Sequence, residues 1–136
     1  MSHLQSSPAP AILLSFDIEE CDVPLECGGA ISPDAQMAIS KKGLDRILGV
    51  LDRHGAVATF YVTAKFAQAH ASDIRKMSER HEIASHGFEH SAFVPADLLK
   101  SRVVLEAITG KPVLGYRMAR MAPVADDDIA AAGYRY

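Results

Sequence analysis

The sequence has no tryptophan, only two cysteines and no large excess of charge of either sign. Lys and Arg together number 14 and Asp and Glu number 17, so the formal net charge is −3. A mildly acidic chain without a basic run is a poor candidate for sequence-independent nucleic-acid binding, so we expect no nucleic-acid partner. The longest uncharged, mostly apolar run covers residues 8–16. It is far shorter than the roughly 20 residues that span a bilayer, so we expect no membrane span.

The first ten residues contain no Lys or Arg and do not resemble a secretory signal. We expect residues 1–10 to form a flexible tail, residues 11–136 to form one domain, and the protein to be cytoplasmic. Cys21 and Cys27 are separated by more than the about two to four residues of a zinc knuckle, and no second cysteine pair follows. We therefore expect two reduced thiols rather than a disulfide or a metal site.

Short apolar segments alternate with segments of helical character along the rest of the chain. Strands are expected at residues 11–16, 56–63, 81–84 and 113–116, with a fifth beginning at residue 134. Between them we expect a loop over residues 20–39, a helix capped by Ser40 and closed by Gly55, a helix over residues 64–80 broken near Ser72, and helices over residues 95–110 and 124–132. Such alternation is typical of an α/β protein with a parallel sheet, here of about four βα units plus the start of a fifth strand. A closed (β/α) barrel needs about 250 residues, so this is either a small open sheet or the first part of a larger barrel.

Charged side chains and imidazoles follow the predicted strands. Asp17 and Glu19 come after the first strand, His86 and His90 after the third, and Arg117 after the fourth. Active sites of parallel α/β sheets gather at the carboxyl ends of the strands, so these groups are expected on one rim. Asp17 and Glu19 are two residues apart and share one side of the chain, where two carboxylates repel unless a cation or a proton separates them.

The two histidines have the i, i+4 spacing that places both imidazoles on one face of a helical turn. Two histidines and one carboxylate form a common catalytic zinc set with an open position, so Glu19, His86 and His90 are the expected metal ligands. The alternative left open by the residues alone is a solvated acidic loop with a coincidental histidine pair. Glu20 and Glu89 are expected to be surface charges, Glu20 being a substitute ligand.

Arg117 is either a surface charge or the partner that orients Asp17, and Arg120 is a second candidate for that role. The three remaining histidines in this part of the chain are expected to be structural or exposed: His54, His70 and His81.

Several motifs together resemble the polysaccharide deacetylases, the NodB-homology domain of carbohydrate esterase family 4. Residues 15–20 (SFDIEE) are similar to the D-x-[DE] variant of the family's first motif, residues 58–62 (ATFYV) to its second strand, and residues 82–90 (EIASHGFEH) to its paired-histidine motif. Residues 116–121 (YRMARM) are similar to the third motif, although its proline is absent. The resemblance covers residues 11–136 and implies an incomplete, distorted (β/α) barrel of the NodB type.

The resemblance implies an enzyme that removes N-acetyl groups from amino-sugar polymers or oligosaccharides, with an N-acetylated carbohydrate as its partner. Asp17 would be the general base, oriented by Arg117, and Glu19, His86 and His90 would hold a divalent metal, with zinc expected. The family's later motifs, including the histidine that acts as general acid, match nothing in this sequence. We therefore expect that a metal can bind while turnover is severely reduced.

Two alternatives remain open. One is a truncated, non-catalytic descendant that binds carbohydrate or a protein partner, and the other is a related metallohydrolase that acts on a small amide. The absence of tryptophan leaves an extended aromatic groove for a polymer unsupported. An open sheet edge would also favour self-association.

Overall fold

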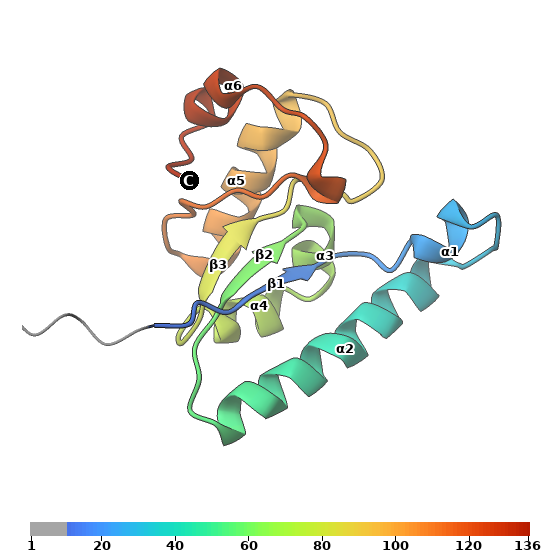
Figure 1. The fold of residues 1–136 in the computed structure, drawn as a ribbon, viewed down its shortest axis with the longest axis vertical. Helices are drawn as coiled ribbons and strands as arrows, with labels where there is room; N and C mark the ends of the chain where they lie inside the picture. The colour runs from blue at the N-terminus through green and yellow to red at the C-terminus, as the bar shows by residue number, and fades with distance from the viewer. Residues whose placement is uncertain (1–10) are drawn as a thin grey trace, which may run out of the picture.

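A computed structural model describes residues 11–136, and the expected tail over residues 1–10 lies outside them. Three parallel strands form the sheet in the order β1-β2-β3 (Figure 1): β1 (Ser15–Ile18), β2 (Thr59–Val62) and β3 (Glu82–Ser85). Asp17 pairs with Tyr61 and Tyr61 with Ala84. The predicted α/β class with a parallel sheet is confirmed.

The sheet continues beyond β3 as isolated backbone contacts. The expected fourth strand is reduced to one parallel bridge between Ser85 and Tyr116. The end of the chain lies alongside, since Arg135 N donates to Leu114 O (2.7 Å) and Tyr116 N to Tyr136 O (2.7 Å). Gly115 lies within this segment, and a Cβ built on it would be 2.6 Å from the Tyr136 ring. This glycine therefore permits a close approach that a regular strand residue would block.

β1 begins later than expected. Ile12 and Leu13 belong to no strand and are 88% and 94% exposed. β2 begins only at Thr59, whose N–H donates to Leu14 O (3.0 Å), so the segment before Leu14 has no paired neighbour among the described residues. As a result Asp17 lies within the strand rather than after it. The self-association expected through the open sheet edge at the last strand of the chain stays a prediction.

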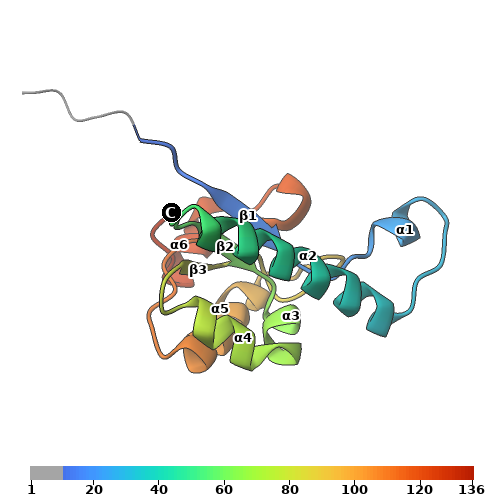
Figure 2. The same ribbon diagram turned by 90° about the horizontal axis from the view of Figure 1, so that it is seen from below.

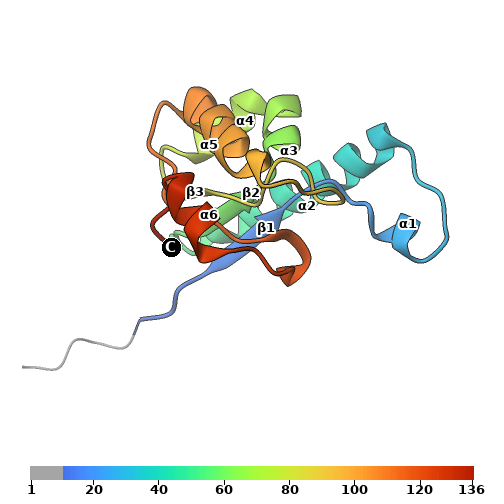
Figure 3. The ribbon, with the colours of Figure 1, turned by 90° about the horizontal axis from the view of Figure 1, so that it is seen from above.

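Six α-helices and a short 3-10 helix connect the strands within residues 11–136: α1 (Val23–Glu26), α2 (Pro33–Arg53), α3 (Ala64–Ala69), α4 (Ala71–Met77), α5 (Ala96–Thr109), η1 (Ala119–Met121) and α6 (Asp126–Ala131). Helices α3, α4 and α5 lie together on one face of the sheet (Figures 2 and 3). The helix predicted over residues 64–80 is broken at His70, two residues before the predicted position. α5 ends at Gly110 as predicted, with a left-handed backbone at φ 69°.

α2 is longer than the sequence pattern indicates. It begins at Pro33 with Ser32 as N-cap, whose Oγ accepts from Ala35 N (3.2 Å), so the prediction of a cap at Ser40 is wrong. Ser-Pro-Asp is a strong start signal, because proline fits the first turn and Asp34 complements the helix dipole. The first turns lack a continuous apolar stripe because they extend away from the sheet towards α1 (Figure 1). Because α1 and the first turns of α2 fall within residues 20–39, much of the expected loop is helical.

The core lies between the sheet and helices α3–α5. Phe60 and Val62 project from β2 towards those helices and are fully buried. They belong to one cluster with large buried side chains from the helices: Phe66, Ile74, Leu98 and Leu105. Alternation along the strands turns Asp17 and Tyr61 to the opposite face of the sheet, so the core packing fixes where the polar side chains point. None of the helices within residues 11–136 has the length and apolarity needed to cross a membrane.

Candidate metal centre

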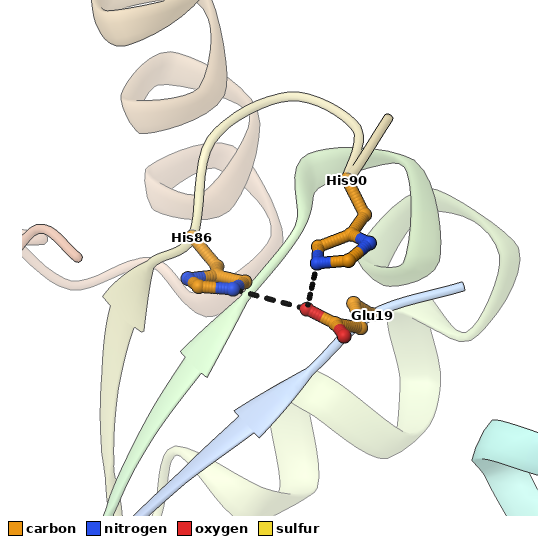
Figure 4. Close-up of side chains that lie close together, drawn as sticks. All are labelled: Glu19, His86 and His90. Atoms are coloured by element: carbon orange, nitrogen blue, oxygen red, sulfur yellow. Dashed lines mark ion pairs between the residues drawn. The ribbon is translucent and has the colours of Figure 1, made fainter. Parts of the chain in front are cut away.

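Three side chains converge at the carboxyl ends of the strands. Glu19 follows β1, while His86 and His90 follow β3 (Figure 4). Glu19 Oε2 lies 3.0 Å from His86 Nε2 and 3.2 Å from His90 Nε2. One ligand atom from each residue lies within 4.8 Å of the others. The structure therefore brings together the three residues expected to bind metal.

The two histidines face one another through a loop and not through a helical turn, so that expectation was wrong. The loop after β3 turns at Gly87, whose φ is +88°. It is fixed to the start of α3, since Ala64 N donates to Gly87 O (3.0 Å) and Lys65 N to Phe88 O (2.9 Å). The two imidazole rings are stacked with centroids 6.0 Å apart.

The hydrogen bonds of the imidazoles define their tautomers. His86 Nδ1 lies 2.8 Å from Arg117 O, and His90 Nδ1 lies 2.8 Å from Asp22 Oδ1. A carbonyl or carboxylate oxygen can only accept, so each Nδ1 carries a proton, and the neutral form of each ring then has its lone pair on Nε2. Both Nε2 atoms lie within 3.2 Å of Glu19 Oε2, a buried oxygen with no hydrogen-bond partner among the described residues. Three potential ligand atoms gathered in this way fit a divalent cation.

Asp17 is held beside this cluster by Arg117. Arg117 Nη1 donates to Asp17 Oδ1 (2.6 Å) and Nη2 to Ser15 Oγ (2.9 Å), while the guanidinium lies 3.9 Å from the centre of the Tyr61 ring. The Asp17 side chain remains 38% exposed. Of the two roles weighed for Arg117, the geometry matches the partner of Asp17.

A cavity of about 300 Å³ opens next to Asp17 and Glu19. Cys21 and apolar residues of α2, including Ile39 and Leu44, also line it. This volume is at the lower end of small-ligand pockets, which span about 300–1,000 Å³.

Both Cys21 and Cys27 are free thiols.

Asp22 was not singled out in the sequence, although it is central to this cluster. It is 3% exposed and contacts His90, Ser91 and Arg120. Burial alone raises the pKa of the Asp22 carboxyl, but the hydrogen bonds from Ser91 and His90 and the charge of Arg120 lower it below its usual value on balance. Arg120 pairs with Asp22 and Glu26 rather than with Asp17. Only folding brings these residues together, so no local pattern indicated them.

Glu20 is not the surface charge that the sequence suggested. It is 3% exposed, and its Oε2 accepts from Thr63 Oγ1 (3.0 Å), the N-cap residue of α3. It is not among the residues whose ligand atoms gather with those of His86 and His90, so it is no substitute ligand in this geometry. Glu89 forms a partly exposed pair with Lys65 at 2.8 Å.

The remaining histidines of the described chain lie elsewhere. His54 is exposed at the end of α2, His70 separates α3 from α4, and His81 accepts from Ala58 N (3.3 Å) before β3. None of them supplies a third imidazole to the cluster, in line with their expected structural or exposed positions.

A parallel α/β sheet with an acid and histidine cluster at the carboxyl ends of its strands is the arrangement expected of part of a (β/α) barrel, where functional residues gather at that end. The model of the polysaccharide deacetylase family matches residues 5–136, and the chain belongs to that family. Among curated proteins, no sequence matches this chain.

Solved structures have the same fold. A protein from Mycobacterium smegmatis assigned as a polysaccharide deacetylase is 27% identical, with a TM-score of 0.69 over 90% of this chain and 48% of its own. A family 4 acetyl xylan esterase from Clostridium thermocellum in complex with a cobalt ion is 23% identical, with a TM-score of 0.55 over 81% and 49%. A carbohydrate esterase family 4 pseudoenzyme from Bacillus anthracis is 15% identical, with a TM-score of 0.59 over 88% and 38%. The chain therefore spans about half or less of the length of each of these three solved structures.

Proposed function

We propose that the chain carries the metal site and the general base of a metal-dependent hydrolase that removes N-acetyl groups from amino-sugar polymers or oligosaccharides. One observation carries the proposal. Glu19 Oε2 has no hydrogen-bond partner within residues 11–136, yet two histidine Nε2 atoms lie 3.0 and 3.2 Å from it. Membership of the polysaccharide deacetylase family supports an acetylated carbohydrate as the substrate.

Glu19, His86 and His90 would hold the ion. Nitrogen donors from two histidines and one carboxylate suit zinc, and a tetrahedral ion held by three ligands keeps one position for substrate or water. The cobalt ion in the acetyl xylan esterase supports a divalent metal in this family. Neighbouring ligand atoms around a zinc with bonds of about 2.1 Å are about 3.4 Å apart, close to the contacts from Glu19 to both imidazoles.

A bound cation would polarise the acyl carbonyl and lower the pKa of a water molecule. Asp17 would take the proton of the attacking water, because it is the exposed carboxylate beside the donor set. Arg117 holds the Asp17 carboxylate in one orientation, and the hydroxyl of Ser15 in turn accepts from the Arg117 guanidinium. The departing amine also needs a proton, and the described residues offer no further histidine near the cluster to supply it.

The first test is the metal content of the purified chain. We expect about one zinc or similar divalent ion per chain after reconstitution, lost in the double variant His86→Ala/His90→Ala. The matched control is His54→Ala, an exposed histidine away from the cluster, which should retain the ion. Folded protein that binds no ion, or a double variant that still binds it, would exclude this site.

The second test separates chemistry from binding. We expect Asp17→Asn to retain the ion but to release at least about 100-fold less acetate from N-acetylated sugars, if the wild type releases any. Bound metal without acetate release from sugars would favour the non-catalytic alternative, which the similarity to a pseudoenzyme supports at the level of fold. Release from small amides alone would favour the other metallohydrolase.

A further inference from the structure

We infer that Arg120 and Asp22 form a positioning chain that holds His90 in the tautomer needed to bind metal. For the metal, this inference rests on the proposed function. The tautomer of His90, in contrast, can be tested without any metal.

Asp22 connects the two ends of the chain. Its Oδ1 accepts from His90 Nδ1 (2.8 Å), and its Oδ2 accepts from Arg120 Nη2 (3.1 Å) and from the Ser91 hydroxyl. The side chain is almost completely buried, so water does not compete for these bonds. Because a carboxylate cannot donate, it holds a proton on His90 Nδ1, and in the neutral ring this leaves the lone pair on Nε2, which lies 3.2 Å from Glu19 Oε2.

Arg120 has a backbone conformation that is unusual for its residue type. Its φ and ψ are 58° and 15°, in the left-handed region that favours glycine, and the next residue, Met121, has φ 52°. Such strain persists only where the surrounding contacts determine it. The contacts here are the guanidinium bonds to Asp22 and to Glu26 (2.5 Å). The strained turn thus places the Arg120 guanidinium next to the buried Asp22 carboxylate.

His86 provides an internal comparison. Its Nδ1 faces the main-chain oxygen of Arg117, which any residue at that position supplies. His90 instead depends on a side chain that a single substitution removes. Loss of Asp22 should therefore affect His90 and leave the tautomer of His86 unchanged.

The first experiment records the imidazole nitrogens of the metal-free protein by NMR at about pH 8, where ordinary imidazoles are neutral. In wild type we expect the Nδ1–H tautomer at both histidines. In Asp22→Ala we expect His90 alone to shift towards the Nε2–H tautomer. Asp127→Ala, an exposed aspartate of α6, is the control. An unchanged His90 in a folded Asp22→Ala variant would overturn the inference.

The second experiment measures zinc affinity by competition with a chelator. We expect about a 10- to 100-fold loss for Asp22→Ala, a smaller loss for Asp22→Asn, and no change for Asp127→Ala. Arg120→Ala should weaken zinc binding much less once Asp22 is already Ala, because the two act in series. Independent, additive losses would contradict the positioning chain.

Circular dichroism of each variant distinguishes lost folding from lost positioning. If Asp22→Ala does not fold, Asp22→Leu, which has a similar branched shape and no hydrogen-bond acceptor, replaces it in both experiments with the same criteria. If no protein binds zinc, the proposed function fails, while the tautomer of His90 still decides whether Asp22 positions it.

Discussion

Arg117 supports the cluster through two different groups. Its guanidinium holds Asp17, 100 residues earlier in the chain, whereas its carbonyl oxygen accepts from His86 Nδ1. The guanidinium also rests on the Tyr61 ring, which limits its freedom to turn away. One residue therefore adjoins both Asp17, the proposed base, and His86, a proposed metal ligand. Substitution of Arg117 removes its side-chain contact with Asp17 and leaves its carbonyl contact with His86.

Arg117→Ala separates the two contributions. We expect zinc binding within about twofold of wild type, because the carbonyl of residue 117 remains. We expect hydrolysis to be about 10- to 100-fold slower, because Asp17 loses its orientation. This loss is smaller than the loss expected when a general base is removed. Acetate release and zinc titration measure the two quantities. Arg46→Ala, an exposed arginine of α2, should change neither. A large loss of zinc affinity in Arg117→Ala would contradict this division of roles.

Spacing along the chain was sufficient to predict some of these residues and insufficient for others. Glu19 and the paired histidines occupy strand ends, where the parallel topology gathers side chains, so the sequence indicated their proximity. The contacts of Asp22 with His90 and Arg120 join residues 68 and 98 positions apart. No periodicity encodes such contacts, because they depend on how three separate segments pack: the ones after β1, after β3 and around η1.

At the scale of elements, α2 shows how a start signal outweighs an apolar pattern. The apolar spacing that begins at Leu44 marks the part of the helix that buries Leu44 and Leu51 in the core. The helix itself begins at Pro33 because Ser32 and Pro33 satisfy the backbone requirements of a first turn. The limits of β1 also differ from the apolar run in the sequence. The strand ends at Ile18 because its limits are set by hydrogen bonding to β2 and not by hydrophobicity.

The N-cap of α2 can be tested with two serines of the same helix. We expect Ser32→Ala to lower the free energy of unfolding by about 1 kcal/mol, since the Ala35 N–H loses its acceptor. Ser40→Ala lies inside the helix, where alanine is the better helix former, and should change stability by less than about 0.5 kcal/mol. Urea unfolding measures both. A larger loss of stability in Ser40→Ala than in Ser32→Ala would indicate that the helix begins at Ser40.

At the scale of the whole molecule, the end of the chain closes onto the sheet through tyrosines. The Tyr116 and Tyr134 rings pack with centroids 5.1 Å apart, and Tyr136 donates to Glu82. Burial raises the pKa of Tyr116 to about 12, with smaller contributions from Tyr134 and Asp97. Burial also raises the pKa values of Tyr134 and Tyr136. These phenols favour the folded state only while they are protonated.

This arrangement predicts a loss of stability in alkali. In the unfolded chain Tyr116 ionises near pH 10, whereas in the folded protein it stays protonated to about pH 12. Its contribution is therefore complete below about pH 10 and decreases above it, by at most about 1.4 kcal/mol per pH unit. Urea unfolding across this range should show a steeper decrease for wild type than for Tyr116→Phe. Parallel decreases would show that Tyr116 has no such role.

The chain distances inside the candidate site have a consequence for the order of folding. Local turns and helices such as α4 and α5 can form from neighbouring residues, but the contact of Asp17 with Arg117 closes a loop of about 100 residues. Contacts of such separation form slowly, because loop entropy is lost before any of them contributes. A chain that has acquired its helices but not its last strand contacts would therefore have neither an oriented base nor a supported His90. Uptake of the ion would then mark the completion of folding and not an early step.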